Sequence, residues 1–342
     1  MPAPKREGTG GAGFAGAGAG MTVHRLFTGC SPLDSRAGGE NSVAMNVAVV
    51  DVGSNTIRLL VAARSRAGLA CVARGKRAVG LGADVERLGG VSAPKLAEAV
   101  ECVGRFAAEA RACGAVHLDV VVASPGRQAE NADQLVHMLS RAAGVPVRVL
   151  TRDEEARLAF DGALVSARPS GAIAVCDIGG GSTQIAVGTA SGGPAWLRSV
   201  DLGSLRLSAR IACGNPPGKA EVAALRAEAR AAFARVTPPL PGEAIAVGGT
   251  ARALRKLVGR SLGREELKDA LRLLRKDSAR SVAIRYGIDL WRARALPAGA
   301  AIVAELHELL GVPLEVGRGG LREGVALELL AGLSRKAQAG GR

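Results

Sequence analysis

The chain has 342 residues, of which 48% are hydrophobic and 22% charged. That composition predicts a folded protein of about two domains and excludes a wholly disordered one. Lysine and arginine outnumber aspartate and glutamate by 45 to 31, a net charge of +14, which favours polyanionic partners. The chain has only two Trp, one Tyr and five Phe, which offer few aromatic rings for bases to stack on. We therefore expect no nucleic acid partner.

Residues 1–45 are rich in glycine, alanine and serine without periodicity, which predicts a disordered leader. Gly11 to Gly16 matches the G-x-G-x-x-G dinucleotide motif, but no strand precedes it and no helix follows, so we attribute the match to low complexity. The leader lacks the leucine- or valine-rich stretch of a secretory signal, and no apolar run reaches the roughly 18 residues of a membrane span. With six widely separated cysteines, these features predict a cytoplasmic protein with reduced thiols and no membrane partner.

From Val47 onward, short β-rich runs alternate with helical stretches, which predicts an α/β fold with parallel or mixed sheets. The expected strands are Val47 to Val50, Ile57 to Ala62, Leu69 to Ala73, Leu118 to Ala123, Val147 to Leu150, Ile173 to Cys176, Ile185 to Gly188, Trp196 to Asp201, Ala244 to Val247 and Leu314 to Val316. The expected helices are Pro94 to Cys113, Ala129 to Ala143, Asp153 to Ala167, Ala220 to Val236, Arg264 to Lys276, Ala298 to Leu310 and Gly320 to Leu333.

A strand-turn-strand pattern occurs twice in the chain. Val49 to Ile57 and Val175 to Ile185 each contain an apolar strand, an aspartate near its end, a Gly/Ser turn and a second strand. The two aspartates, Asp51 and Asp177, are 126 residues apart. This period is the size of a domain and therefore predicts two similar lobes that face each other.

The residues of these turns suit phosphate. Glycines let backbone N–H groups close around phosphate oxygens, and the hydroxyls of Ser54, Ser182 and Thr183 add donors. Asp51 and Asp177 would then hold a divalent cation between the lobes through water, as magnesium sites built from hard oxygen ligands do.

Six motifs in order resemble the exopolyphosphatase and guanosine pentaphosphate phosphohydrolase (Ppx/GppA) family. That family belongs to the superfamily of actin, sugar kinases and heat-shock chaperones. The motifs are Asp51 to Leu59, Arg127 to Asn131, Glu154 to Arg157, Asp177 to Gln184, Gly248 to Thr250 and Gly320 to Gly324. The resemblance implies two ribonuclease-H-like lobes of the actin-like ATPase fold, with a phosphate-binding cleft between them. Residues 46–153 would form the first lobe and residues 154–319 the second, and the helix over 320–336 would pack back on the first lobe.

The resemblance also implies the site residues and the activity. The phosphate-binding residues would be Gly53, Ser54, Asn55, Gly179, Gly180, Gly181, Ser182, Thr183, Gly248, Gly249 and Thr250. Asp51, Asp177 and Gln184 would hold Mg²⁺ or Mn²⁺. Water would attack the terminal phosphate of polyphosphate or guanosine pentaphosphate, with Glu155 as general base. A homodimer is a further hypothesis from the family.

Several of these residues also have a purely structural interpretation. Glu154 and Glu155 both suit a helix N-terminus, but Thr151 and Glu154 form a capping box, which leaves Glu155 free. Arg127 is either a phosphate clamp or an ordinary surface arginine. Strand alternation favours a surface or structural ion pair as the role of Arg58, and Arg322 suits helix capping or lobe closure as well as substrate contact.

Two features leave the activity open. The basic residues between 252 and 294 favour a solvated helix face over a track for polyphosphate. Gln184 stands where the family has a glutamate, and a neutral amide weakens metal binding. The alternatives to a hydrolase are therefore a sensor that binds polyphosphate or an alarmone without cleaving it, and an ATP-dependent kinase or ATPase of the same superfamily. The spacing of Glu155 argues against the kinase.

Overall fold

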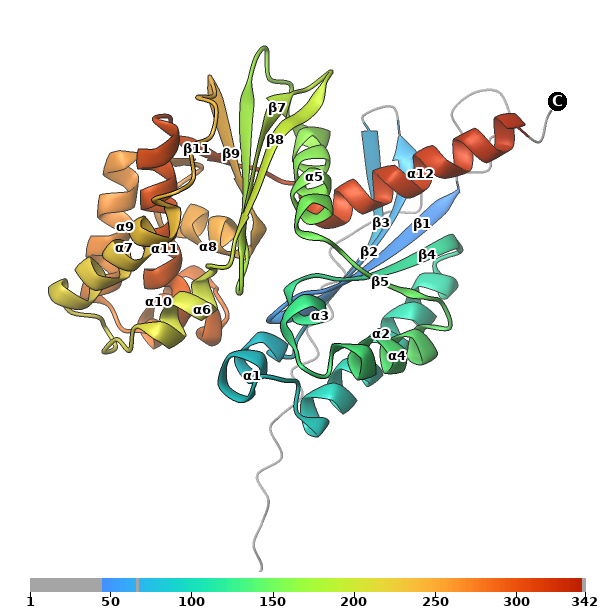
Figure 1. Ribbon diagram of the computed structural model, residues 1–342, viewed down its shortest axis with the longest axis horizontal. Coiled ribbons are helices and arrows are strands. Elements are labelled where there is room, and N and C mark those ends of the chain that lie inside the picture. Colours follow the sequence, from blue (N-terminus) through green and yellow to red (C-terminus); the bar gives the residue numbers. More distant parts are fainter. Residues whose placement is uncertain (1–44, 66–67, 340–342) are drawn as a thin grey trace, which may run out of the picture. The chain divides into compact units, whose positions relative to one another are not determined.

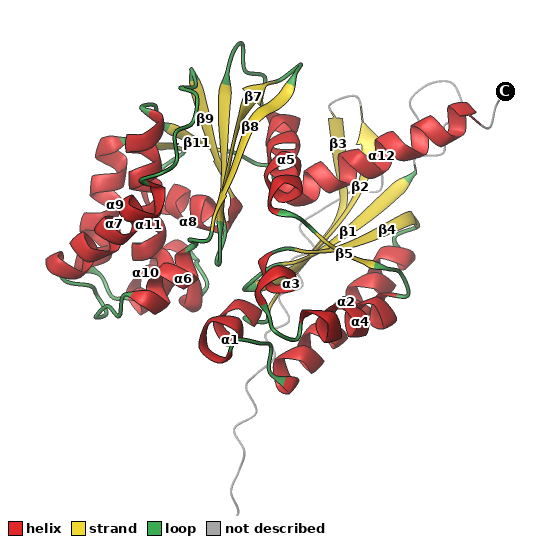
Figure 2. Ribbon diagram, viewed as in Figure 1, coloured by secondary structure: helices red, strands yellow, loops and turns green. Residues whose placement is uncertain are grey.

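The computed structural model describes residues 45–65 and 68–339. The predicted leader lies outside these residues except for Met45. Two β-sheets with helices on both faces make up the described chain (Figures 1 and 2). The predicted α/β class is therefore confirmed.

The first sheet contains an antiparallel hairpin extended by parallel strands. In spatial order its strands are β3 (Gly68–Ala78), β2 (Thr56–Ser65), β1 (Asn46–Val52), β4 (Ala115–Val122) and β5 (Val147–Val149). β1 pairs antiparallel with β2 and parallel with β4. Residues 47–50 of β1 are buried on both faces of the sheet, which explains why this strand reads as a continuous apolar run.

The second sheet repeats the same order and adds one short strand. Its strands are β8 (Gly193–Val200), β7 (Thr183–Thr189), β6 (Ile173–Ile178), β9 (Glu243–Val247), β11 (Leu314–Val316) and β10 (Ser261–Leu262). β6 pairs antiparallel with β7 and parallel with β9, so β6 corresponds to β1 and β7 to β2. The repeat found in the sequence is thus a repeat of sheet topology, as expected for two ribonuclease-H-like lobes.

The helices are named in chain order. They are α1 (Leu81–Leu88), α2 (Ala93–Ala112), α3 (Ser124–Gln128), α4 (Ala132–Ala143), α5 (Arg152–Ala163), η1 (Leu164–Ser166), α6 (Ser204–Arg210), α7 (Lys219–Phe233), α8 (Gly248–Val258), α9 (Arg264–Lys276), α10 (Ala279–Tyr286), α11 (Leu290–Leu310) and α12 (Leu321–Ala339).

Helices α5 and α12 pack against each other beside both sheets (Figure 1). α12 contacts β1 and β2, whereas α5 contacts β6, β7 and β8. Leu158 of α5 belongs to the core that α12 forms with the first sheet, and Phe160 belongs to a core under the second sheet. α5 is therefore held between two hydrophobic cores, which fixes any side chain at its N-terminal end.

Each predicted strand and long helix is present, and the differences lie in short or interrupted helices. One helix was predicted from Ala298 to Leu310, yet α11 begins at Leu290 and contains Pro297. Leu296 and Ala298, on either side, are both 1% exposed. Burial of this apolar helix outweighs the roughly 3 kcal/mol that an internal proline costs.

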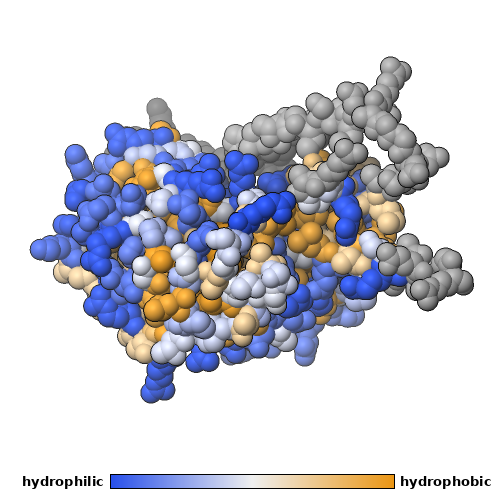
Figure 3. Space-filling model, turned by 90° about the horizontal axis from the view of Figure 1, so that it is seen from above, coloured by the Kyte–Doolittle hydropathy of each residue, from blue (hydrophilic) through white to orange (hydrophobic). Residues whose placement is uncertain are grey.

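The described part of the chain contains no helix that is both long and apolar enough to cross a bilayer. On the face seen in Figure 3, hydrophilic and hydrophobic residues are intermixed. Ile284 and Leu240 are the most exposed of the large hydrophobic residues, and they lie in different elements.

Candidate active site

A cleft lies between the two sheets. The hairpin turns β1–β2 and β6–β7 line it, together with the N-terminal ends of α5, α8, α11 and α12. The predicted phosphate-binding residues that line it are Gly53, Ser54, Asn55, Gly179, Gly180, Gly181, Ser182, Gly248 and Gly249. The fold therefore brings the two copies of the repeat and the third glycine motif together at one cavity.

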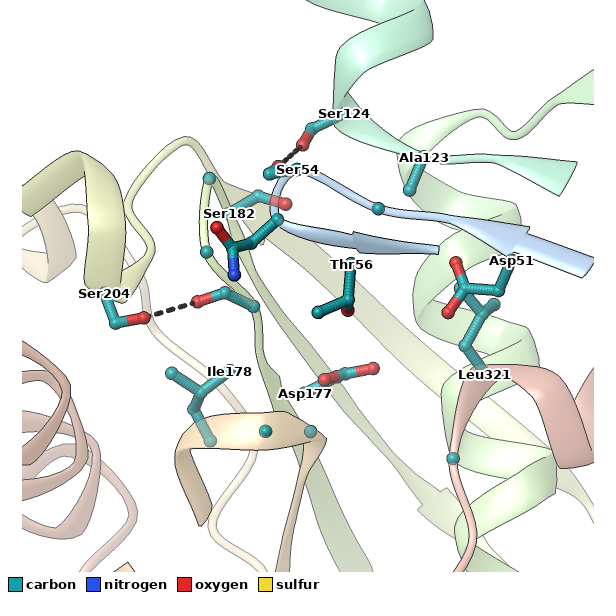
Figure 4. A pocket seen from close by; sticks show the side chains of 18 of the residues that line it. Asp51, Ser54, Thr56, Ala123, Ser124, Asp177, Ile178, Ser182, Ser204 and Leu321 are labelled. Atoms are coloured by element: carbon teal, nitrogen blue, oxygen red, sulfur yellow. Dashed lines mark hydrogen bonds between the residues drawn. The ribbon is translucent and has the colours of Figure 1, made fainter. Parts of the chain in front are cut away.

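The two hairpin turns touch each other at the cleft. Ser54 Oγ lies 2.6 Å from Ser124 Oγ (Figure 4), and a Cβ on Gly181 would lie 2.8 Å from Ser54 Oγ. Asn55 Nδ2 is buried and has no hydrogen-bond partner among the described residues. Because a buried donor without a partner is costly, this amide is suited to a ligand oxygen in the cleft.

Two predicted phosphate ligands do not line the cleft. The hydroxyl of Thr183 donates to the carbonyl oxygen of Leu202 at 2.6 Å, and the side chain is fully buried. Thr250 is 1% exposed, and its hydroxyl lies 3.3 Å from Ser204 Oγ. Both hydroxyls form hydrogen bonds inside the second lobe, so we assign them to stabilising its loops rather than to binding phosphate.

Gly248 must be a glycine in this structure. Its φ of 91° lies in the left-handed region, which disfavours a side chain. A Cβ would also come within 2.5 Å of Asp177 Oδ1. The glycine thus starts α8 directly against the aspartate of the second hairpin, which places a helix N-terminus at the cleft.

Asp51 and Asp177 occupy equivalent positions in β1 and β6, and their carboxylates point toward each other in the cleft (Figure 4). Burial raises the pKa of both groups, that of Asp177 to about 6. Neither carboxylate has a hydrogen bond or an ion pair within the described residues, although positively charged arginines lie near both. Both residues are half-buried, and two such acids facing each other would gain from a positively charged ligand.

Glu155 reaches the cleft from the first turn of α5. The predicted capping box is confirmed: Thr151 Oγ1 accepts from the Glu154 amide at 3.2 Å, and Glu154 Oε2 accepts from the Thr151 amide at 2.8 Å. Glu155 has no part in this cap and is 7% exposed. Burial raises its pKa to about 7, opposed by the nearby guanidinium of Arg127.

Arg127 lies behind Glu155 and does not line the cleft. Its Nη2 donates to Glu155 Oε2 at 2.7 Å, and its Nη1 donates to the carbonyl oxygen of Leu150 at 2.7 Å. These bonds use both Nη atoms of the guanidinium, while its buried Nε has no partner among the described residues. In this geometry Arg127 is placed to orient the carboxylate of Glu155, and its role as a phosphate clamp stays a prediction.

The sheet register equates Arg58 with Gln184. Asp51 lies opposite Arg58 in the first hairpin, and Asp177 lies opposite Gln184 in the second. Directly opposed residues of an antiparallel pair project to the same face, so Arg58 faces the cleft and lines it. The predicted surface role for Arg58 was wrong because the sequence did not reveal which face of the strand is covered.

Gln184 is 2% exposed and lines the cleft. Its amide nitrogen lies 2.9 Å from Ser182 Oγ and 3.2 Å from Ser199 Oγ, to which it donates. The two serines therefore fix the orientation of the amide and leave its carbonyl oxygen as the acceptor in the cleft.

Four arginines from four separate elements meet in the cleft. They are Arg58 of β2, Arg252 of α8, Arg292 of α11 and Arg322 of α12. Burial, reinforced by repulsion from Arg58, lowers the pKa of Arg252 to about 9 and that of Arg292 to about 10. Such crowding of like charges is costly without an anion, so the cluster is suited to a ligand with several negative charges.

Sequence reasoning missed Arg252 and Arg292. Both fall in the basic stretch that was interpreted as a solvated helix face, and that interpretation was wrong for these two residues. Arg252 lies four residues after Gly248, which is one helical turn and the same side of α8. That spacing was the available signal for Arg252, whereas nothing local distinguished Arg292 from its neighbours.

Comparison with known proteins connects this geometry to a family. The model of the Ppx/GppA phosphatase family matches residues 60–332. A guanosine-5'-triphosphate,3'-diphosphate pyrophosphatase of Vibrio vulnificus is 28% identical over 302 residues, which cover 84% of this chain and 59% of that protein. Exopolyphosphatase 1 of Mycobacterium tuberculosis is 28% identical over 308 residues, covering 84% of this chain and 88% of the relative.

Solved structures share the fold. An exopolyphosphatase from Cytophaga hutchinsonii matches with a TM-score of 0.77 at 20% identity, over 84% of this chain and 98% of that chain. The Ppx/GppA family member of Aquifex aeolicus matches with a TM-score of 0.73 at 24% identity, over 84% of this chain and 98% of that chain.

Proposed function

Because the chain belongs to the Ppx/GppA phosphatase family, we propose that it hydrolyses the terminal phosphate of polyphosphate or of guanosine pentaphosphate. The observation that carries the proposal is one cleft that contains both a glutamate with a pKa of about 7 and four arginines. The glutamate is suited to accept a proton from water near neutral pH, and the arginines are suited to neutralise phosphate oxygens.

In the proposed reaction, the Glu155 carboxylate takes a proton from a water molecule as the water oxygen attacks the terminal phosphorus. The bond from phosphorus to the bridging oxygen breaks, and inorganic phosphate leaves together with a chain shorter by one phosphate. Arg127 holds Glu155 in position through the bond at 2.7 Å. The arginines and the glycine turns hold the non-bridging oxygens, which fixes the phosphorus relative to the water.

A divalent cation, Mg²⁺ or Mn²⁺, is part of the proposal, and the donor set fits a cation that keeps most of its water ligands. Asp51, Asp177 and the carbonyl oxygen of Gln184 are hard oxygen donors at the cleft. Among residues 45–65 and 68–339, no three His, Cys, Asp or Glu side chains are grouped closely enough to enclose a metal. The residues therefore suit a hydrated cation held mainly through water. When bound, the cation would supply positive charge to the phosphate oxygens.

A sensor that binds without cleaving is the second candidate, and the neutral Gln184 favours it. An amide carries no charge, so this side chain adds no negative charge for a cation, and its nitrogen is bonded to two serines.

A cytoplasmic location and a homodimer are further parts of the proposal. Cys102, Cys113, Cys176 and Cys213 are unlinked thiols, which supports a reducing compartment.

The test is phosphate release by the purified protein from long polyphosphate, tripolyphosphate, guanosine pentaphosphate and ATP, with Mg²⁺ or Mn²⁺. We expect Glu155→Gln to lower kcat about 10²- to 10⁴-fold, since it removes the proton acceptor. Activity of the unmodified protein should rise as the pH increases through about 7, where Glu155 becomes ionised. Glu154→Gln, which keeps the capping box, is the matched control.

Two outcomes would contradict the hydrolase. Release from ATP alone would support the kinase or ATPase alternative. Tight binding of polyphosphate or guanosine pentaphosphate without release would favour the sensor, and Gln184→Glu would then be the variant to test for recovery of activity.

A further inference from the structure

The N-terminal end of α11 places an aromatic ring at the cleft beside one of its arginines. Trp291 and Arg292 both line the cavity. The guanidinium carbon of Arg292 lies 4.3 Å from the centroid of the Trp291 ring, and Lys76 Nζ of β3 lies 6.0 Å from the same centroid. The first distance is well inside the range at which a cation is attracted to the face of an indole.

Arg292 has no carboxylate partner. It makes no ion pair and no side-chain hydrogen bond within the described residues, although it is half-buried. Loss of water and repulsion from Arg58 lower its pKa to about 10, and the charge of Asp289 only partly opposes them. A Cβ on Gly249 would lie 2.3 Å from Arg292 Nη1. The guanidinium therefore lies between the indole and the third glycine motif, in direct contact with both.

The carboxylate nearest to Arg292 along the chain is engaged elsewhere. Asp289 is the N-cap residue of α11, but its side chain does not cap the helix. Its Oδ2 accepts instead from Lys76 Nζ. Lys76 belongs to the first sheet and α11 to the second lobe, so this solvent-exposed ion pair connects the start of α11, which carries Trp291, to the opposite wall of the cleft.

We propose that Trp291 is a positioning residue that holds Arg292 for contact with the substrate phosphates. A carboxylate partner would occupy N–H donors of the guanidinium and cancel its charge, whereas an aromatic face holds the cation and leaves its donors free. Arg292 thereby keeps its five N–H groups for phosphate oxygens at the third glycine motif. This inference rests on the proposed function, because it takes a phosphate chain as the ligand of the cleft.

The experiment measures binding of tripolyphosphate by isothermal titration calorimetry in the Glu155→Gln background, where turnover is slow. We expect Trp291→Leu, which keeps bulk but loses the aromatic face, to weaken binding about five- to thirtyfold. Trp291→Phe should recover most of that loss. The matched control is Trp196→Leu on β8, which changes the other tryptophan of the chain outside the cleft and should leave the affinity unchanged.

A double-mutant cycle separates positioning from general support of the fold. In an Arg292→Ala background, Trp291→Leu should cause little further loss, because the cation that it orients is gone. Additive losses, or an equal loss in Trp291→Phe and Trp291→Leu, would overturn the inference, as would failure of the Glu155→Gln parent to bind tripolyphosphate. Circular dichroism and thermal unfolding confirm that each variant is folded.

Phosphate release by the protein with Glu155 intact is a separate measurement. A protein that shows the expected binding pattern but releases no phosphate would end the hydrolase proposal and leave the role of Trp291 standing. A protein that hydrolyses polyphosphate but shows additive losses in the mutant cycle would support the hydrolase proposal and overturn the role of Trp291.

Discussion

Glu155 shows how a single residue serves the proposed reaction at the expense of stability. Packing of α5 between two cores leaves this carboxyl 7% exposed, and the loss of water raises its pKa from 4.5 to about 7. A carboxyl with such a pKa is a better proton acceptor near neutral pH than an ordinary glutamate. The same shift means that the folded protein resists ionisation of Glu155, so the charged form destabilises the fold.

We predict that Glu155→Gln raises the free energy of unfolding at pH 8. The pKa of Glu155 is higher in the folded state, so its favourable contribution is complete below about pH 4.5 and is lost as the pH rises through about 7. The neutral amide avoids that loss, which is on the order of 3 kcal/mol. Urea unfolding at pH 5 and pH 8 would measure it, with a much smaller gain expected at pH 5.

Glu154→Gln is the control at the same helix end. The capping bonds with Thr151 lower the pKa of Glu154, so its ionised form favours folding and its replacement should give no gain at pH 8. An equal gain in both variants, or a gain in Glu155→Gln that does not depend on pH, would contradict the assigned burial of Glu155.

At the scale of elements, the crossing of α5 and α12 depends on glycines. A Cβ on Gly162 would lie 1.9 Å from the carbonyl oxygen of Gly320, and a Cβ on Gly324 would lie 1.9 Å from that of Leu158. The obstructing atoms are backbone atoms, which cannot move aside as a side chain would. The motif Gly320 to Gly324 therefore brings α12 close to α5, and this contact places Arg322 and Glu155 at one cleft.

We predict that Gly324→Ala destabilises the protein by at least 2 kcal/mol and lowers activity, because the two helices must separate. Gly332→Ala is the matched control: it lies in the same helix, and its Cβ would meet no atom within 4 Å. That change should be neutral or stabilise by up to about 1 kcal/mol, since alanine favours helix. Thermal unfolding of the two variants tests the prediction, and similar melting temperatures would refute it.

At the scale of the whole described chain, hydrogen bonds and ion pairs from α6 to α1 and α3 connect the two lobes. Arg206 of α6 donates to Glu86 of α1 at 2.8 Å and to Gln128 of α3 at 2.8 Å, and its side chain is only 11% exposed. Asp201 accepts from Arg152 at 2.6 Å. Since the cleft is built from both lobes, these bonds determine how closely its two halves approach.

We predict that Arg206→Ala opens the lobes, because it removes the bonds that α6 makes to Glu86 and Gln128 of the first lobe. The expected results are a larger radius of gyration by small-angle X-ray scattering and a kcat/KM lower by about tenfold. Arg210→Ala is the control on the same helix, since Arg210 pairs with Glu228 inside the second lobe. If the two variants have the same radius and activity, Arg206 does not control closure.

The sequence by itself determined the features that short stretches carry. Strand-turn-strand repeats, glycine turns, the capping box and the order of the motifs depend on neighbouring residues, so local patterns predicted the α/β fold, the hairpins and the aspartates of the cleft. The family resemblance, and the proposal of Glu155 as general base, followed from the same contiguous motifs.

Only the tertiary structure decided how distant residues combine. Arg58 faces the cleft because of its strand register, and Arg127 contacts Glu155, 28 residues away in the chain, rather than the cavity. Arg252 and Arg292 join the site from separate helices. Side-chain direction and loss of water depend on which elements pack together, and those contacts connect residues up to hundreds of positions apart, so no local pattern encodes them.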